Sequence, residues 1–201
     1  SAVSSVEYLT NPTIHQRVTM GKTLEIGQAE IYDLEKLLAS NSEVCFVSPF
    51  KEDKYRKIQE SGMILAISAS HMEEHPLARA EWIKFMALFF EKESLADSIF
   101  NAIKAEYYEA VKLTENIEVR PTVLSGKMYQ DVWYISGGKS YISQLFEDAG
   151  AEYIWKDLPF SGSEPYDFEI VLQKAHNADF WVFQEFFAGE YSSQNLLNEN
   201  N

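Results

Sequence analysis

The chain has 201 residues, of which 46% are hydrophobic and 14% aromatic, and this composition predicts a globular fold rather than a disordered chain. Seventeen Lys and Arg against 31 Asp and Glu give a net charge of −14, which argues against nucleic acid and anionic membrane as partners, because both attract basic surfaces. The longest apolar run, residues 85–90, is far shorter than the roughly 18 residues of a membrane-spanning helix, and the first twelve residues lack the pattern of a signal peptide.

The N-terminal third of the sequence predicts a βαβ unit, which implies a parallel sheet. Asp33 is the expected N-cap of a helix, and Tyr55 and Ile58 mark the inward face of another. The single cysteine, Cys45, lies in an apolar run and is expected to be a core thiol, so it predicts neither a disulfide nor a metal cluster. The expected elements are helices at 14–20 and 34–39, a strand at 43–47, a helix at 51–60 and a strand at 63–67.

The stretch Pro76–Phe90 has the helical period but is apolar on nearly every face. Such a helix is expected to be buried on several sides, and fifteen residues would make a rod about 22 Å long. Because α/β patterns precede and follow it, we expect it to connect two α/β lobes. A second helix is expected from a Ser94 cap to about Thr114. Its predicted buried stripe consists of Leu95, Ile99, Ile103, Tyr107 and Ala110.

The α/β alternation then restarts, with a turn at Ser136-Gly137-Gly138 that leads into a helix. The inward residues of that helix are expected to be Ile142, Leu145 and Phe146. The predicted elements are strands at 122–124, 131–135, 153–155 and 179–183 and helices at 139–148 and 167–174.

The sequence contains one match to a catalytic motif: His71, Glu74 and His75 fit the H-x-x-E-H pattern of a metal-dependent hydrolase. That chemistry needs both imidazoles on one helical face, but Pro76 disfavours helical backbone at His75. A polar loop is therefore expected here. Ser125 and Ser161 lack a G-x-S-x-G elbow, so the sequence does not support nucleophilic catalysis.

The glycine turn suggests a binding site of a different kind. Gly137-Gly138-Lys139-Ser140 is no Walker A motif, because Trp133 occupies the position of the first required glycine. A glycine turn that opens a helix can still hold a polar ligand group on free N–H groups, and it can equally be an ordinary turn. Aromatic residues near loop edges add candidates for ligand contact, with a core role as the alternative. These are Tyr129, Trp133 and Tyr166.

Three sequence blocks resemble the class III periplasmic substrate-binding proteins of ABC importers, which are receptors for iron–siderophores, haem and cobalamin. The blocks are DLEKLLASNSEVCFVSPF, EEHPLARAEWIKFMALFF, and PTVLSGKMYQDVWYISGGKSYISQLFEDAGAEYIWKD with DFEIVLQKAHNADFWVF. The second is closest in wording to Bacteroidetes-type members. The resemblance covers residues 33–187 and lies in the order and spacing of the blocks rather than in any catalytic signature.

The resemblance implies an α/β fold of two three-layer lobes with parallel sheets, joined by a single rigid connecting helix. The expected parts are an N-terminal lobe at 1–75, the connecting helix at 76–92 and a C-terminal lobe at 93–201. It implies a non-enzymatic receptor with no resident cofactor or metal, which binds a metal chelate in the interlobe cleft. The expected ligand-binding residues are Pro49, Phe50, Tyr129, Trp133, Tyr134, Ser136, Lys139, Ser140 and Tyr166.

The partner implied by the resemblance is an ABC permease, with Glu52 and Glu190 as the acidic docking residues. The implied location is the periplasm, with membrane contact only through a lipid anchor outside this chain. Family members are longer, so we expect this sequence to lack both ends of the receptor. Two other functions stay open: the metal-dependent hydrolase of residues 71–75, and an interaction module without a small ligand.

Overall fold

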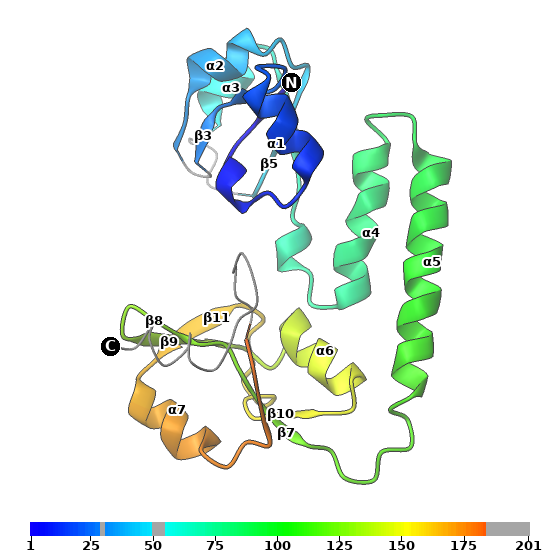
Figure 1. Ribbon diagram of the computed structural model, residues 1–201, viewed down its shortest axis with the longest axis vertical. Coiled ribbons are helices and arrows are strands. Elements are labelled where there is room, and N and C mark those ends of the chain that lie inside the picture. The colour runs from blue at the N-terminus through cyan, green and yellow to red at the C-terminus, as the bar shows by residue number, and fades with distance from the viewer. Residues whose placement is uncertain (29–30, 50–54, 184–201) are drawn as a thin grey trace. The chain divides into compact units, whose positions relative to one another are not determined.

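The computed structural model describes residues 1–28, 31–49 and 55–183, and the chain divides into two compact units, Ser1–Ala69 and Ser70–Asn201. Each unit combines short strands with helices, which confirms the α/β class (Figure 1). Unit 1 contains β1 (Ala2–Val3), η1 (Val6–Tyr8), α1 (Pro12–Thr19), β2 (Leu24–Glu25), β3 (Gly27–Gln28), β4 (Ile31–Tyr32), α2 (Leu34–Ala39), β5 (Val44–Val47), α3 (Arg56–Glu60) and β6 (Ile64–Ile67).

Unit 1 contains the expected βαβ arrangement. Strands β5 and β6 pair in parallel, with α3 between them in the chain. The predicted cap is also confirmed, because the Asp33 side chain accepts a hydrogen bond from the Lys36 backbone N–H at 3.0 Å. A small core of Ile26, Leu37 and Ile58 holds the unit together. Cys45 packs half-buried against this core, and burial raises the pKa of its thiol.

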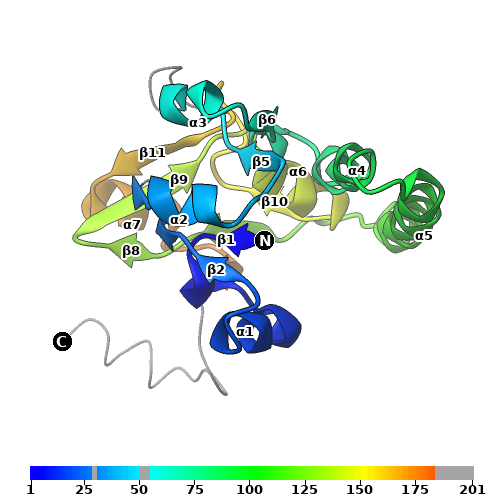
Figure 2. The same ribbon diagram turned by 90° about the horizontal axis from the view of Figure 1, so that it is seen from above.

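Unit 2 begins with two helices that lie side by side and antiparallel (Figures 1 and 2). Its elements are η3 (Ser70–Met72), α4 (Pro76–Ala87), α5 (Glu93–Lys112), β7 (Thr122–Ser125), β8 (Met128–Tyr129), β9 (Val132–Ser136), α6 (Tyr141–Asp148), β10 (Glu152–Tyr153), β11 (Ser163–Tyr166), α7 (Phe168–Ala175) and β12 (Phe180–Val182).

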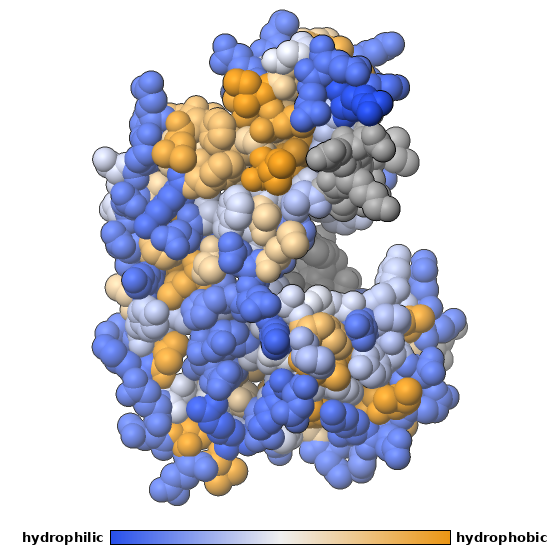
Figure 3. Space-filling view, turned by 180° about the vertical axis from the view of Figure 1, so that it is seen from behind, coloured by the Kyte–Doolittle hydropathy of each residue, from blue (hydrophilic) through white to orange (hydrophobic). Residues whose placement is uncertain are grey.

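Helix α4 is shorter than predicted, but within its bounds only Glu81 is exposed, which agrees with the predicted burial on several sides. It stops at Ala87, and a turn joins it to α5. Leu88 and Phe90 in that turn are 60% and 62% exposed, and hydrophobic side chains gather at this end of the helix pair (Figure 3). The predicted end of the helix at Phe90 is wrong because the apolar run continues from the helix into the turn, where the helical period no longer applies.

Helix α5 turns a different face inward from the one predicted. Its buried residues are Ala96 and Phe100, whereas Leu95, Ile99 and Ile103 of the predicted stripe are 39–57% exposed. The Lys84 ammonium of α4 lies 4.4 Å from the centre of the Phe100 ring and 3.2 Å from Asp97. In the first half of the helix the inward face is thus shifted by one residue, which is about 100° of helix rotation. Tyr107 of the predicted stripe does face inward: it is half-buried, and its hydroxyl donates a hydrogen bond to Asp148 on α6. The Ser94 cap is also wrong, because the helix already begins at Glu93.

Two three-stranded sheets form the rest of unit 2. Strands β10, β7 and β12 are parallel, as expected, whereas β11, β9 and β8 form an antiparallel sheet that was not predicted. Strand β11 has the sequence SEPY, in which Pro165 and the polar residues give no strand pattern. The predicted inward position of Leu145 on α6 is wrong, because this side chain is exposed, and the side chains of β12 are exposed as well.

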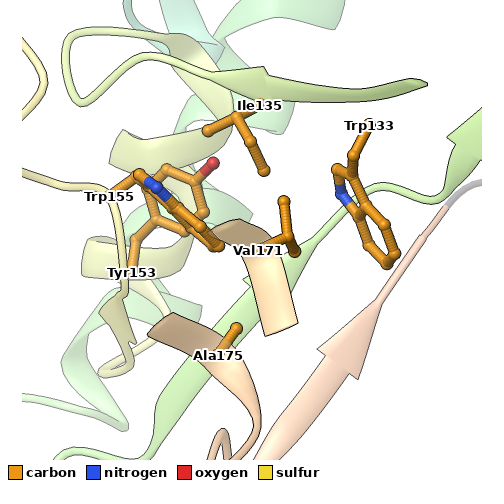
Figure 4. Packing of buried hydrophobic residues seen from close by; sticks show 6 residues of the cluster. All are labelled: Trp133, Ile135, Tyr153, Trp155, Val171 and Ala175. Atoms are coloured by element: carbon orange, nitrogen blue, oxygen red, sulfur yellow. The ribbon is translucent and has the colours of Figure 1, made fainter. Parts of the chain in front are cut away.

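The core of unit 2 lies between the antiparallel sheet and α7. It contains Trp133 and Ile135 from β9, Tyr153 and Trp155 from and just after β10, and Val171 and Ala175 from α7 (Figure 4). Within this core the Tyr153 hydroxyl donates a hydrogen bond to the Ser136 carbonyl at 2.8 Å. The end of β9, where the glycine turn begins, is therefore tied to the best-packed part of the unit.

Candidate functional site

The glycine turn after β9 is held against the segment 156–162 by backbone contacts that only glycine permits. A Cβ atom on Gly138 would lie 1.9 Å from the Lys156 carbonyl oxygen, and one on Gly137 would lie 1.9 Å from that of Phe160. The Gly137 N–H donates to the Gly162 carbonyl at 2.8 Å, and the Gly138 N–H donates to that of Leu158 at 3.0 Å. The turn and the segment before β11 therefore form one connected surface.

Helix α6 begins directly after this turn. Ser140 is its N-cap, and its buried hydroxyl accepts a hydrogen bond from the Ser143 N–H at 3.2 Å. Tyr141 and Ile142 are the first residues of the helix, where N–H groups have no partner within the helix and the dipole is positive. This end of α6 can therefore donate hydrogen bonds to a ligand oxygen.

A pocket of about 340 Å³ opens beside this helix end. Its walls come from η3 and the residue after it, from the end of β9, from the start of α6, and from the segment that leads into β11. The pocket lining consists of His71, Met72, Glu73, Ser136, Ser140, Tyr141, Ile142, Ser161, Gly162 and Ser163. Four serines, one imidazole and one carboxylate give the pocket several hydrogen-bonding groups, and Met72, Tyr141 and Ile142 add apolar surface.

Two contacts position the walls of the pocket. The Trp82 indole N–H on α4 donates a hydrogen bond to the Glu73 carboxylate at 2.8 Å. The Arg79 guanidinium, also on α4, lies 3.8 Å from the centre of the Tyr141 ring. Helix α4 thus contacts both the wall that carries Glu73 and the wall that carries Tyr141.

A second pocket of unit 2, of about 260 Å³, is less suited to a ligand because both of its cationic side chains are already engaged. Lys156 lies 3.1 Å from the Glu152 carboxylate, and Arg120 donates to the Glu147 carbonyl at 3.1 Å. Such a surface is typical of a solvated ion-pair network rather than of a binding site.

The structure brings some of the predicted ligand-binding residues to the 340 Å³ pocket. Ser136 and Ser140 line it. Lys139 lies between them in the chain and is exposed, and Tyr134 on β9 is also exposed.

Other predicted ligand-binding residues lie away from the pocket lining. Trp133 is only 5% exposed, and its indole N–H donates to the Ser125 carbonyl at 3.0 Å inside the core. Tyr166 pairs with Trp133 across the sheet and packs half-buried against the same core. Tyr129 is exposed on β8, and Pro49 is half-buried in unit 1. Phe50, Glu52 and Glu190 lie outside the described residues.

The residues of the hydrolase motif do not share a helix. His71 is in the 3-10 helix η3, whereas His75 has extended backbone and caps α4 by accepting a hydrogen bond from the Leu77 N–H on its Nδ1 atom. The expected break before Pro76 is thus confirmed. Within residues 1–28, 31–49 and 55–183, no three His, Cys, Asp or Glu side chains are grouped so that they could hold a metal ion.

The pocket residues that sequence reasoning missed come from segments far apart in the chain. None of Met72, Glu73 and Ser163 was predicted to contact a ligand. The sequence suggested His71 only as a metal ligand of the hydrolase motif and Ser161 only as a nucleophile. One signal was available: Gly162 lies in the segment SGS, which has the composition of a turn. Nothing in the sequence alone indicates that this turn meets the glycine turn at residues 137–138.

Comparison with known proteins settles what kind of chain this is. Residues 67–186, more than half of the sequence, match the periplasmic binding protein family. This chain belongs to the periplasmic binding protein family. The matched range contains every residue of the pocket lining. It confirms the resemblance inferred from the three sequence blocks, and it is a family of binding proteins.

Among similar proteins is the uncharacterized lipoprotein MJ0878 of Methanocaldococcus jannaschii, which is 29% identical over 174 residues, covering 84% of this chain and 41% of that protein. The solved structure of the periplasmic heme-binding protein RhuT from Roseiflexus sp. RS-1 has a TM-score of 0.66 and 20% identity, over 81% of this chain and 62% of RhuT. The solved structure of the periplasmic vitamin B12 binding protein BtuF of Vibrio cholerae has a TM-score of 0.67 and 12% identity, over 98% of this chain and 69% of BtuF. The structural similarities show a shared fold, and the chain spans less than half of MJ0878.

Among the described residues, no helix is both long enough and apolar enough to cross a lipid bilayer.

Proposed function

We propose that this chain is part of the substrate-binding receptor of an ABC importer, which holds a metal chelate and delivers it to the permease. The observation that carries the proposal is that the family match covers the whole pocket, from His71 to Ser163. The chelate classes under consideration are haem, cobalamin and iron–siderophores. The names of RhuT and BtuF support the first two, and the sequence resemblance adds the third.

The binding site in this proposal is centred on the pocket beside α6. Ser136 and Ser140 keep the roles predicted for them, and Lys139 and Tyr134 are exposed close to them in the chain. Hydroxyl groups and helix N–H groups suit the polar periphery of a chelate, because such a ligand must exchange hydrogen bonds to water for hydrogen bonds to the protein. Trp133 has no direct contact role in the proposal, since it is part of the core.

Two further parts of the proposal rest on the resemblance and on the relatives. Docking on the permease would use acidic residues, with Glu52 and Glu190 as the candidates. The location would be outside the cytoplasmic membrane, and the lipoprotein name of MJ0878 favours a lipid anchor on the whole protein.

Tryptophan fluorescence gives a direct test. The chain has four Trp residues, and all of them lie in unit 2, at 82, 133, 155 and 181. Haemin, cyanocobalamin and ferrioxamine B absorb light strongly, so binding of any of them near the pocket should quench this emission. We expect saturable quenching by at least one probe, with the affinity confirmed by calorimetry. No saturable response to any probe by either method would refute a chelate-binding function.

A pair of variants shows whether the pocket is the site. Ser161→Phe fills part of the lining, whereas Ser94→Phe places the same side chain on the exposed surface of α5. If a bulky side chain in the space that the ligand needs costs about 1–3 kcal/mol, as overpacking does, Ser161→Phe should weaken binding roughly five- to 150-fold. Equal affinities of the two variants for a chelate that binds the unmodified chain would place the site elsewhere.

A further inference from the structure

Resting on the proposed function, we infer that the ligand presents an uncharged edge bearing amide or hydroxyl groups to this pocket. The chain would then prefer a neutral or cationic metal chelate to an anionic one. The inference depends on the distribution of charge and of hydrogen-bonding groups around the pocket.

The charge of the lining is the first observation. Glu73 is the only carboxylate among the ten lining residues, and none of them is Lys or Arg. The other polar groups are serine hydroxyls, one tyrosine and His71. A carboxylate or catecholate buried against this surface would lose its hydration without gaining an ammonium or guanidinium partner, which costs free energy.

Two cationic residues neighbour the lining residues, one by contact and one in the chain, without lining the pocket. The Arg79 guanidinium lies against the Tyr141 ring, so its charge is already engaged with the aromatic face. Lys139 is exposed, and its ammonium is therefore well hydrated. Neither one replaces a cation within the lining.

The hydrogen-bonding groups favour an amide over a carboxylate. The start of α6 supplies N–H donors and the positive end of the helix dipole, which suit a carbonyl oxygen. Glu73, on the wall formed by η3 and the residue after it, is an acceptor-only group when ionised. The start of α6 would also suit a carboxylate oxygen, so Glu73 and the lack of Lys and Arg among the lining residues make the difference. A primary amide has N–H donors for Glu73, whereas a carboxylate has none and is repelled by it.

The charge of the whole chain acts in the same direction. A net charge of −14 at pH 7 lowers the rate at which an anion approaches the protein and raises the rate for a cation. This long-range effect weakens with salt, whereas the local effect of Glu73 is screened less. The salt dependence of affinity therefore separates the two.

The experiment titrates the full chain with probes of different charge. Cyanocobalamin is rich in amides and neutral, and ferrioxamine B is a cationic hydroxamate chelate. Haemin carries two carboxylates, and ferric enterobactin is an anionic catecholate chelate. We expect cyanocobalamin or ferrioxamine B to bind at least about tenfold more tightly than either anionic probe. Tighter binding of haemin or ferric enterobactin would overturn this inference and leave the proposed function standing, whereas no binding of any probe would refute both.

Charge variants test whether Glu73 causes the preference. Glu73→Gln removes the charge but keeps an amide oxygen that can accept the hydrogen bond from Trp82. The exposed neighbour Glu74 is outside the lining, so Glu74→Gln is the matched control. We expect Glu73→Gln to shift the ratio of anionic to neutral affinity about fivefold toward the anion, because one partly screened repulsion is removed. An equal shift in both variants would contradict the role of Glu73.

Discussion

Substitution of Gly138 by Ala tests the geometry on which the site depends. The added Cβ would lie 1.9 Å from the Lys156 carbonyl oxygen and 2.8 Å from that of Leu158. Both obstacles are backbone atoms, and the Gly138 N–H already donates a hydrogen bond to the Leu158 carbonyl at 3.0 Å. The strain therefore cannot be relieved by rotating a side chain, and the segment 156–162 must move away from the turn.

The expected cost combines overpacking with the loss of one backbone hydrogen bond. Overpacking in a tight site costs about 1–3 kcal/mol and a hydrogen bond about 1 kcal/mol, so we expect a destabilisation of about 3 kcal/mol. With a denaturant dependence of about 2 kcal/mol per M of urea, the midpoint should fall by roughly 1.5 M. Because the displaced segment carries Ser161 and Ser163, chelate binding should weaken as well.

Urea unfolding followed by tryptophan emission is the appropriate assay, because all four Trp residues belong to unit 2 and the signal is specific to it. Gly162→Ala is the matched control: a Cβ at Gly162 has no heavy atom within 4 Å. It should shift the midpoint by no more than about 0.3 M. If Gly138→Ala unfolds at the same urea concentration as Gly162→Ala, the close approach of the two segments is wrong.

Three further predictions also follow the unfolding of unit 2 by tryptophan emission, the first two in urea and the third in acid. Tyr153→Phe should destabilise unit 2 by about 1–2 kcal/mol, because the Ser136 carbonyl loses a buried donor. Arg79→Met should cost about 1 kcal/mol, since the apolar stem is kept but the cation over the ring at the start of α6 is lost. Hydrogen bonds from Thr122 lower the pKa of Asp179. The ionised carboxylate therefore stabilises the unit above pH about 4, and this stabilisation is lost as the pH falls further. Asp179→Asn should lose less stability on acidification than the unmodified chain.

Each of these predictions has a result that would contradict it. An unchanged midpoint in Tyr153→Phe would mean that the Ser136 carbonyl does not depend on this bond. If Arg79→Lys is no more stable than Arg79→Met, a cation over the Tyr141 ring does not stabilise the unit. Parallel acid-unfolding curves for the unmodified chain and Asp179→Asn would show that another carboxylate carries the pH dependence.

Local signals in the sequence were sufficient for much of the fold. The Asp33 cap and the parallel pairing of β5 with β6 follow from composition and short-range spacing, and both are confirmed. The family was also within reach, because the second and third of the sequence blocks lie inside residues 67–186, which match the family. The cap and the strand pairing depend on hydrogen bonds and patterns within about 25 residues, so a single segment of the chain shows them.

The inward face of α5 is a feature that only packing decided. Leu95, Ile99 and Ile103 have the helical period of a buried stripe, yet Ala96 and Phe100 are the buried residues. A periodic pattern shows that a helix has an apolar face, but the neighbouring helix determines which side is covered. The same holds for Trp133, whose aromatic ring near a loop edge could have served a ligand or the core, and which belongs to the core.

The sequence by itself determined an α/β chain of the periplasmic binding protein family, with a glycine turn that opens a helix. Tertiary structure alone decided the pocket, which joins residues 71–73 to residues 161–163 across about 90 positions of sequence. Their meeting depends on two glycines pressed against the backbone of a distant segment and on α4 contacting both walls. Contacts between segments so far apart leave no periodic or compositional signal in a single sequence. They depend on how the two segments pack against each other and not on the neighbouring residues of either one.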